Sequence, residues 1–170
     1  MTVALVLALG LAVWTGLDQS RHYGADPGGP PTRGAMGQPV RIGASTATVT
    51  LLGFQAASSF PNPKDPAKPV TMTPGAVGVL LDLQFDHGRE DAAALYCTVR
   101  LVQREPVARE WSTTASDILW RARPDAPTSC RATGGSQSTM AVAFMIPDEA
   151  VDHVAVRVTY GSQGTVEISR

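Results

Sequence analysis

Aromatic residues, cysteines and net charge are all scarce in this chain of 170 residues. Aromatics make up 6% of the sequence, cysteines number two, and the formal net charge is −1. A near-neutral chain without a basic block lacks the electrostatic surface that nucleic-acid binding requires, so we expect no nucleic-acid partner. Neither cysteine has a second Cys or His at ligand spacing, which argues against a zinc site.

Catalytic motifs are missing as well, including the nucleophile elbow, the phosphate loop, the dinucleotide fingerprint and the H-E-x-x-H zinc motif. We expect His22 in a linker, His87 in a turn and His153 on the polar face of a strand. His153 beside Asp148 or Asp152 would serve a hydrolase only with an activated Ser or Cys nearby. The sequence therefore predicts no enzyme, no catalytic residue and no cofactor.

The densest polar patch lies on and just after a predicted strand and comprises Asp82, Asp86, His87, Glu90 and Asp91. Carboxylates around one turn are the ligands that Ca²⁺ prefers, but the EF-hand pattern is missing. We interpret the patch as a solvated hairpin end and predict no metal ligand.

An uncharged apolar run at residues 2–17 is the strongest positive signal. Its sixteen residues would span about 24 Å as a helix, against about 30 Å for the hydrocarbon layer of a bilayer. We predict a transmembrane signal anchor over residues 1–17. A cleaved signal peptide and a buried helix of a soluble protein remain alternatives.

Basic residues follow this run, at Arg21 and Arg33, and none precedes it. The positive-inside rule taken literally would leave the following domain in the cytoplasm. Our hypothesis is that a basic segment lies upstream and that the domain is extracytoplasmic.

The composition changes twice after the apolar run. Residues 18–38 are rich in Pro and Gly and poor in apolar residues, which predicts a linker. Residues 39–170 hold short apolar runs between turn residues, enough for one domain with its own core.

Alternation of apolar and polar residues within this domain predicts half-buried antiparallel strands. The clearest runs have four apolar residues on one face, as at Val79, Leu81, Leu83 and Phe85. The predicted strands lie at 40–42, 48–54, 79–85, 95–101, 107–111, 140–146, 154–160 and 166–169, with one helical turn at 116–122. Seven or eight strands at this spacing predict an all-β sandwich of immunoglobulin type.

The chain has two cysteines, Cys97 and Cys130, and two are enough to close one disulfide in an exported domain. We expect Cys97 to point inward from a strand and to reach Cys130 in the loop before the next long strand. A bridge across this separation would stabilise the fold by about 3–4 kcal/mol in the chain-entropy model. Two unrelated buried thiols are the alternative.

Trp111 and Trp120 are the candidate partner-binding residues, since aromatic side chains dominate interface hot spots. The simpler interpretation, which we favour, is that Trp111 completes a strand and Trp120 packs under the loop held by Cys130.

Six segments of the domain carry a likeness to a known family, at 37–42, 74–82, 95–102, 109–111, 124–130 and 143–148. Through them the domain resembles actinobacterial exported domains with a telokin-like, immunoglobulin-type sandwich, and it is similar to secreted or surface-anchored mycobacterial antigens. The resemblance implies location and architecture, and it supplies no catalytic motif.

The sequence thus predicts a non-enzymatic domain, single-pass in the cell membrane or secreted, with a recognition or structural role at the cell envelope. Its expected partners are the membrane, through the N-terminal helix, and an envelope protein or other envelope component. An extracytoplasmic lipid or small-molecule carrier is the alternative, and an unfamiliar hydrolase is a third hypothesis.

Overall fold

The computed structural model describes residues 29–88, 96–113, 116–132 and 135–170. The predicted membrane segment, 1–17, and residues 18–28 of the predicted linker lie outside this part of the chain. Among the described residues, no helix has both the length and the apolar character that a membrane crossing needs.

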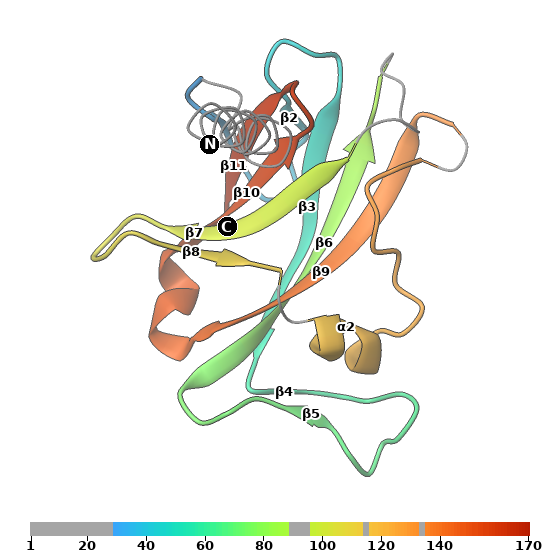
Figure 1. Cartoon of the computed structure of the whole chain (residues 1–170), viewed down its shortest axis with the longest axis vertical. Helices are drawn as coiled ribbons and strands as arrows, with labels where there is room; N and C mark the ends of the chain where they lie inside the picture. The colour runs from blue at the N-terminus through green and yellow to red at the C-terminus, as the bar shows by residue number, and fades with distance from the viewer. Residues whose placement is uncertain (1–28, 89–95, 114–115, 133–134) are drawn as a thin grey trace, which may run out of the picture.

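Two β-sheets face each other in the described part of the chain (Figure 1). The larger sheet has the strand order β1-β11-β10-β7-β8 and the smaller the order β2-β3-β6-β9. The larger sheet contains β1 (Thr32–Ala35), β7 (Cys97–Gln103), β8 (Arg109–Ser112), β10 (Val154–Tyr160) and β11 (Gly164–Ser169). The smaller contains β2 (Val40–Arg41), β3 (Thr48–Ala57), β6 (Ala76–Asp86) and β9 (Gln137–Pro147). The all-β prediction is confirmed, and the architecture is a β-sandwich.

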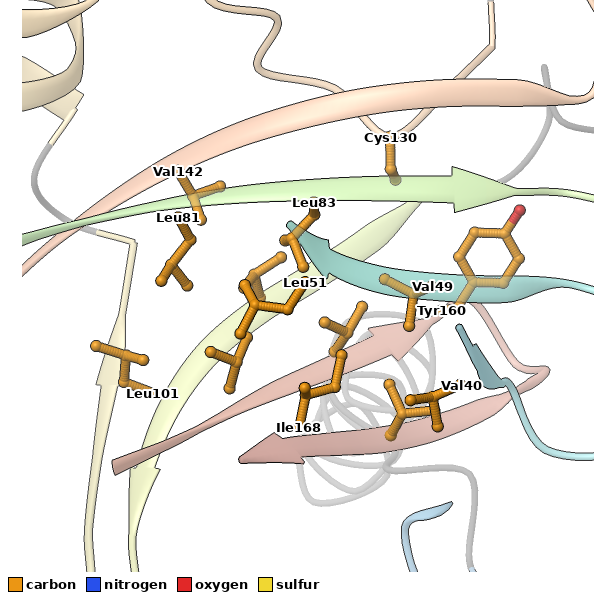
Figure 2. Close-up of a cluster of buried hydrophobic side chains, with 14 of the residues drawn as sticks. Val40, Val49, Leu51, Leu81, Leu83, Leu101, Cys130, Val142, Tyr160 and Ile168 are labelled. Atoms are coloured by element: carbon orange, nitrogen blue, oxygen red, sulfur yellow. The ribbon is translucent and has the colours of Figure 1, made fainter. Parts of the chain in front are cut away.

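The main core fills the space between the two sheets. Leu51, Leu81 and Leu83 from the smaller sheet meet Leu101 and Ile168 from the larger one (Figure 2). All five are fully buried. For Leu81 and Leu83 this burial follows from the period of two along β6. Truncating such a side chain to Ala typically costs about 2–5 kcal/mol, so this core accounts for much of the stability.

A second apolar cluster covers the opposite, outer face of the smaller sheet. The helix α2 (Ser116–Ala122) packs Ile118 and Leu119 there, beside Leu80 of β6 and Ala143 of β9. The short hairpin of β4 (Ser59–Phe60) and β5 (Val70–Thr71) adds the buried side chain of Phe60. This sheet is therefore covered on both faces over part of its length, which explains why β6 carries apolar residues at Leu80 as well as at Leu81.

Strand β1 lies inside the range predicted as linker. It pairs with β11 in parallel, with Thr32 opposite Val166 and Ala35 opposite Ser169. Two predictions are thus corrected: residues 32–38 belong to the sandwich, and the pairing is not antiparallel throughout. Four residues without an apolar pattern gave no strand signal, because an edge strand is fixed by its ladder hydrogen bonds and not by a buried face.

The strand predicted at 154–160 matches β10, but the residue before it belongs to another element. His153 ends the 3₁₀-helix η1 (Asp148–His153) and is exposed. Its placement on the polar face of a strand was therefore wrong. The helical turn predicted at 116–122 is confirmed as α2.

Candidate functional site

A groove of about 610 Å³ lies on the outer face of the smaller sheet, next to α2. Its floor includes Asp82 of β6 and Ala141 of β9. One wall is the segment 122–127, which leaves α2 and runs alongside β9 (Figure 1). Leu52 of β3 and Pro63 of the β4–β5 loop complete the lining on the other side.

An irregularity in β3 shapes the groove. The register with β6 passes from Leu51 opposite Leu83 directly to Gly53 opposite Asp82, so Leu52 is an extra residue in the strand. Such a bulge re-aims a side chain, and Leu52 is 50% exposed. A Cβ at position 53 would lie 2.8 Å from Asp82 Oδ2, so glycine there leaves room for the Asp82 carboxylate.

Two carboxylates and one guanidinium line the groove. Nη1 of Arg123 donates to Oδ1 of Asp82 at 2.7 Å and to Oδ2 at 2.9 Å. Asp125, on the same wall, is exposed and has no ion-pair partner among the described residues. The charged lining thus carries an excess of one negative charge.

The wall is fastened to the sandwich at several points. The N–H of Ala141 donates to the carbonyl of Pro127 at 2.6 Å. Three residues further on, Cys130 forms a disulfide with Cys97 of β7, and their Cα atoms are 6.2 Å apart. This confirms the predicted disulfide, which joins the loop before β9 to the larger sheet. The wall is therefore held by α2 at one end and by a covalent bond at the other.

A buried polar cluster lies at the end of β6, close to that disulfide. His87 is fully buried. Its Nδ1 hydrogen-bonds to the hydroxyl of Tyr160, and its Nε2 lies 2.8 Å from Oγ of Ser138. Oγ of Ser138 in turn donates to the carbonyl of Cys130 at 2.6 Å. Loss of solvation lowers the pKa of His87, although the negative charge of Asp86 opposes this effect.

The direction of these hydrogen bonds decides what the cluster can do. The hydroxyl of Ser138 donates its hydrogen to the carbonyl of Cys130, so it must accept a hydrogen bond from His87. Nε2 of His87 therefore carries the hydrogen, and Nδ1 accepts from the hydroxyl of Tyr160. A nucleophilic serine needs the opposite arrangement, in which its hydroxyl donates to a histidine base. The cluster is therefore built as a clamp joining β6, β9, β10 and the disulfide loop.

The polar patch predicted as a solvated hairpin end is divided between different environments. Asp82 faces the groove, the side chain of Asp86 accepts the N–H of Gly88 at 3.0 Å, and His87 points into the core. The interpretation was wrong for His87, because a turn next to a strand end can still bury a ring against the core. Glu90 and Asp91 lie outside the described residues, and so does His22. Among described residues, no group of three or more metal-ligating side chains is found.

The two predicted partner-binding tryptophans lie in different environments. Trp111 of β8 is half-buried against the main core, as the simpler interpretation expected. Trp120 is 68% exposed; the expectation that it packs under the Cys130 loop was wrong, because Ile118, Leu119 and Ala122 form the buried face of α2. The structure does not place either indole in the lining of the groove.

The outer face of the larger sheet carries a network of ion pairs. Arg157 of β10 pairs with Glu110 at 3.1 Å and with Glu167 at 3.2 Å, and Arg104 reaches Glu167 at 2.5 Å. Burial of Glu167 opposes its ionisation most strongly, but the hydrogen bonds and charges of Arg104 and Arg157 together lower its pKa. This network links β8, β10 and β11 on that face of the sheet.

Several site residues carried no motif and were not singled out in the sequence, namely Leu52, Arg123, Asp125, Ser138 and Tyr160. One signal was available: Gly53 interrupts an apolar strand pattern, and an isolated glycine in a strand suggests a bulge or a close approach. The remaining residues meet only through the fold.

No protein-family model matches the chain, and no curated protein matches it either. A conserved hypothetical protein from Bacillus anthracis has a similar solved structure, with a TM-score of 0.52 and 11% sequence identity over 79% of this chain and 94% of that one. This likeness shows a shared fold. The yjhA protein from Bacillus subtilis is 9% identical over 72% of this chain and 79% of its own (TM-score 0.45). An uncharacterized β-sandwich protein from Clostridium difficile is 10% identical over 82% and 93% (TM-score 0.41).

Proposed function

We propose that this protein is a non-enzymatic recognition domain, held at the outer side of the cell membrane by its N-terminal segment, and that the groove binds its partner. The observation that carries the proposal is the groove wall fastened by the Cys97–Cys130 disulfide. Disulfides persist in oxidising compartments outside the cytoplasm. The same bond holds a concave, mostly apolar surface with a few polar groups, which is the usual form of a binding site.

The immunoglobulin-type assignment is part of this proposal and has partial support. The order β11-β10-β7 corresponds to the GFC strands of an immunoglobulin sheet. In the smaller sheet, β6 lies between β3 and β9. By their place in the chain these strands correspond to A, B and E, which are neighbours in the ABED order of an immunoglobulin sheet. We therefore propose an immunoglobulin-type sandwich similar to that of the exported mycobacterial domains.

The alternatives meet physical obstacles. A carrier that stores its ligand between the sheets would compete with the main core, whose side chains occupy that space. A hydrolase using Ser138 would have to reverse the hydrogen bonds of the buried clamp. Recognition through the groove requires neither change.

Photo-crosslinking in intact cells tests the recognition role. A photoreactive amino acid at position 52 would face the groove, and one at position 107, where Val107 is 54% exposed outside the groove, serves as the matched control. We expect a defined crosslinked product from position 52 and none from position 107. Equal labelling from both positions, or none from position 52, would contradict the proposal.

A further inference from the structure

We infer that the groove binds an extended peptide segment of a partner protein in which a Lys or Arg lies between apolar side chains. This inference rests on the proposed recognition role and names the chemistry of its ligand. It follows from two properties of the lining, which are the shape formed by its apolar side chains and its unbalanced charge.

The apolar side chains give the groove its shape, because those on one wall are short and one side chain projects from the other wall. Ala122, Ala126 and Pro127 give one wall short side chains. Leu52 projects from the bulge in β3 on the opposite side and is half exposed. A groove of about 610 Å³ with these walls accommodates aliphatic side chains of a peptide better than the hydroxyl-rich surface of a glycan.

The charge selects the polar group of the ligand. Arg123 already holds both oxygens of Asp82, so this pair is close to neutral toward a ligand. Asp125 on the same wall keeps an uncompensated negative charge among the described residues. A basic side chain would complete the charge balance, whereas an acidic one would face a like charge.

Selection of peptides by the full chain tests this assignment. The purified chain in mild detergent is presented with a phage library of random peptides, and an identical selection uses Leu52→Arg, which places a long charged side chain over the groove. We expect the wild-type chain alone to enrich peptides with a Lys or Arg flanked by apolar residues. A synthetic peptide from that pool then serves as the probe for affinity measurements.

Two variants with the same change of charge give the control. Asp125→Asn should weaken binding of the synthetic peptide about fivefold, the expected effect of losing one exposed ion pair, and should reduce the dependence of binding on salt. Asp117→Asn removes a carboxylate of α2 that lies outside the groove lining and should leave affinity unchanged.

The outcomes separate this inference from the proposed function. Enrichment of acidic or uncharged peptides that Leu52→Arg fails to bind, or equal affinity of Asp125→Asn and wild type, would overturn the inference and leave the recognition role intact. A glycan crosslinked at position 52 would also overturn the inference and leave the recognition role intact. If wild type and Leu52→Arg enriched the same peptides and no product were crosslinked at position 52, the inference and the proposed recognition role would both be contradicted.

Discussion

His87 shows how one buried side chain can join three strands of a sandwich. Its ring lies among β6, β9 and β10, and both ring nitrogens have hydrogen-bond partners. Each partner matters because a buried donor or acceptor without one costs about 1–3 kcal/mol. Protonation would place a hydrogen on Nδ1, which now accepts from Tyr160, and would add a charge in a site without solvent. The fold therefore favours the neutral ring.

The stability of the protein should consequently depend on pH in a defined window. Because the pKa of His87 is lowered in the folded state, the unfolded chain binds more protons between that pKa and the ordinary value of 6.5. Stability is fully present above 6.5 and is lost as the pH falls through the lowered pKa. Urea unfolding at about pH 7.5 and about pH 5.5 should show a lower free energy of unfolding at the acidic pH.

Substitution of either histidine assigns this effect. His87→Gln should remove most of the difference between the two pH values, while lowering stability at both. His153→Gln should keep the wild-type difference, because that side chain is exposed at the end of η1. A difference that follows His153 instead would disprove the role given to His87.

Ser138 provides a second test at the residue scale. Ser138→Ala leaves Nε2 of His87 and the carbonyl of Cys130 without their partner, so we expect a loss of about 1–3 kcal/mol in the free energy of unfolding. Ser136→Ala, an exposed neighbour on the same segment, should change it by less than about 0.5 kcal/mol. The wild-type protein should not react with a fluorophosphonate probe, and covalent labelling of Ser138 would revive the hydrolase hypothesis.

Among the elements, the loop that contains Cys130 connects the groove to both sheets. It forms the groove wall, caps an N–H of β9 and is tied to β7. In the double variant Cys97→Ala/Cys130→Ala we expect the free energy of unfolding to fall by about 3–4 kcal/mol, since the closed loop spans 33 residues.

Chemical denaturation measures this loss, and the oxidised wild type treated with reductant serves as the comparison. Reductant should destabilise the wild type by a similar amount and leave the double variant unchanged. A double variant as stable as the oxidised wild type would show that the bridge does not hold the wall in place.

Long strands were the elements that the sequence predicted best, and the reason is burial. The alternating apolar residues of β6, β9 and β10 face a core that only one register can fill, so their pattern is visible in the sequence. Strand β1 has no such pattern and depends on its ladder with β11. The bulge in β3 was equally hidden, although Gly53 marked its position.

At the scale of the whole molecule, the sequence predicted the class of fold and the disulfide but not the candidate site. Leu52, Asp82 and Asp125 come from three separate segments, and only the packing of α2 and the β4–β5 loop on the outer face brings their surroundings together. The burial of His87 was missed for a related reason, since its partners Ser138 and Tyr160 are distant in sequence. Local patterns carry information about faces of elements, whereas sites arise where elements meet.

An oxidised domain on the outer side of the membrane is the central feature that we propose for this protein. The most direct test is to treat intact cells with a membrane-impermeant thiol reagent of high mass, with and without prior reduction by an impermeant reductant, and to read the gel shift of the full chain. We predict no shift without reduction and a shift of two labels after it, from Cys97 and Cys130. Two thiols that react only after the cells are permeabilised, with no need for reductant, would contradict the account.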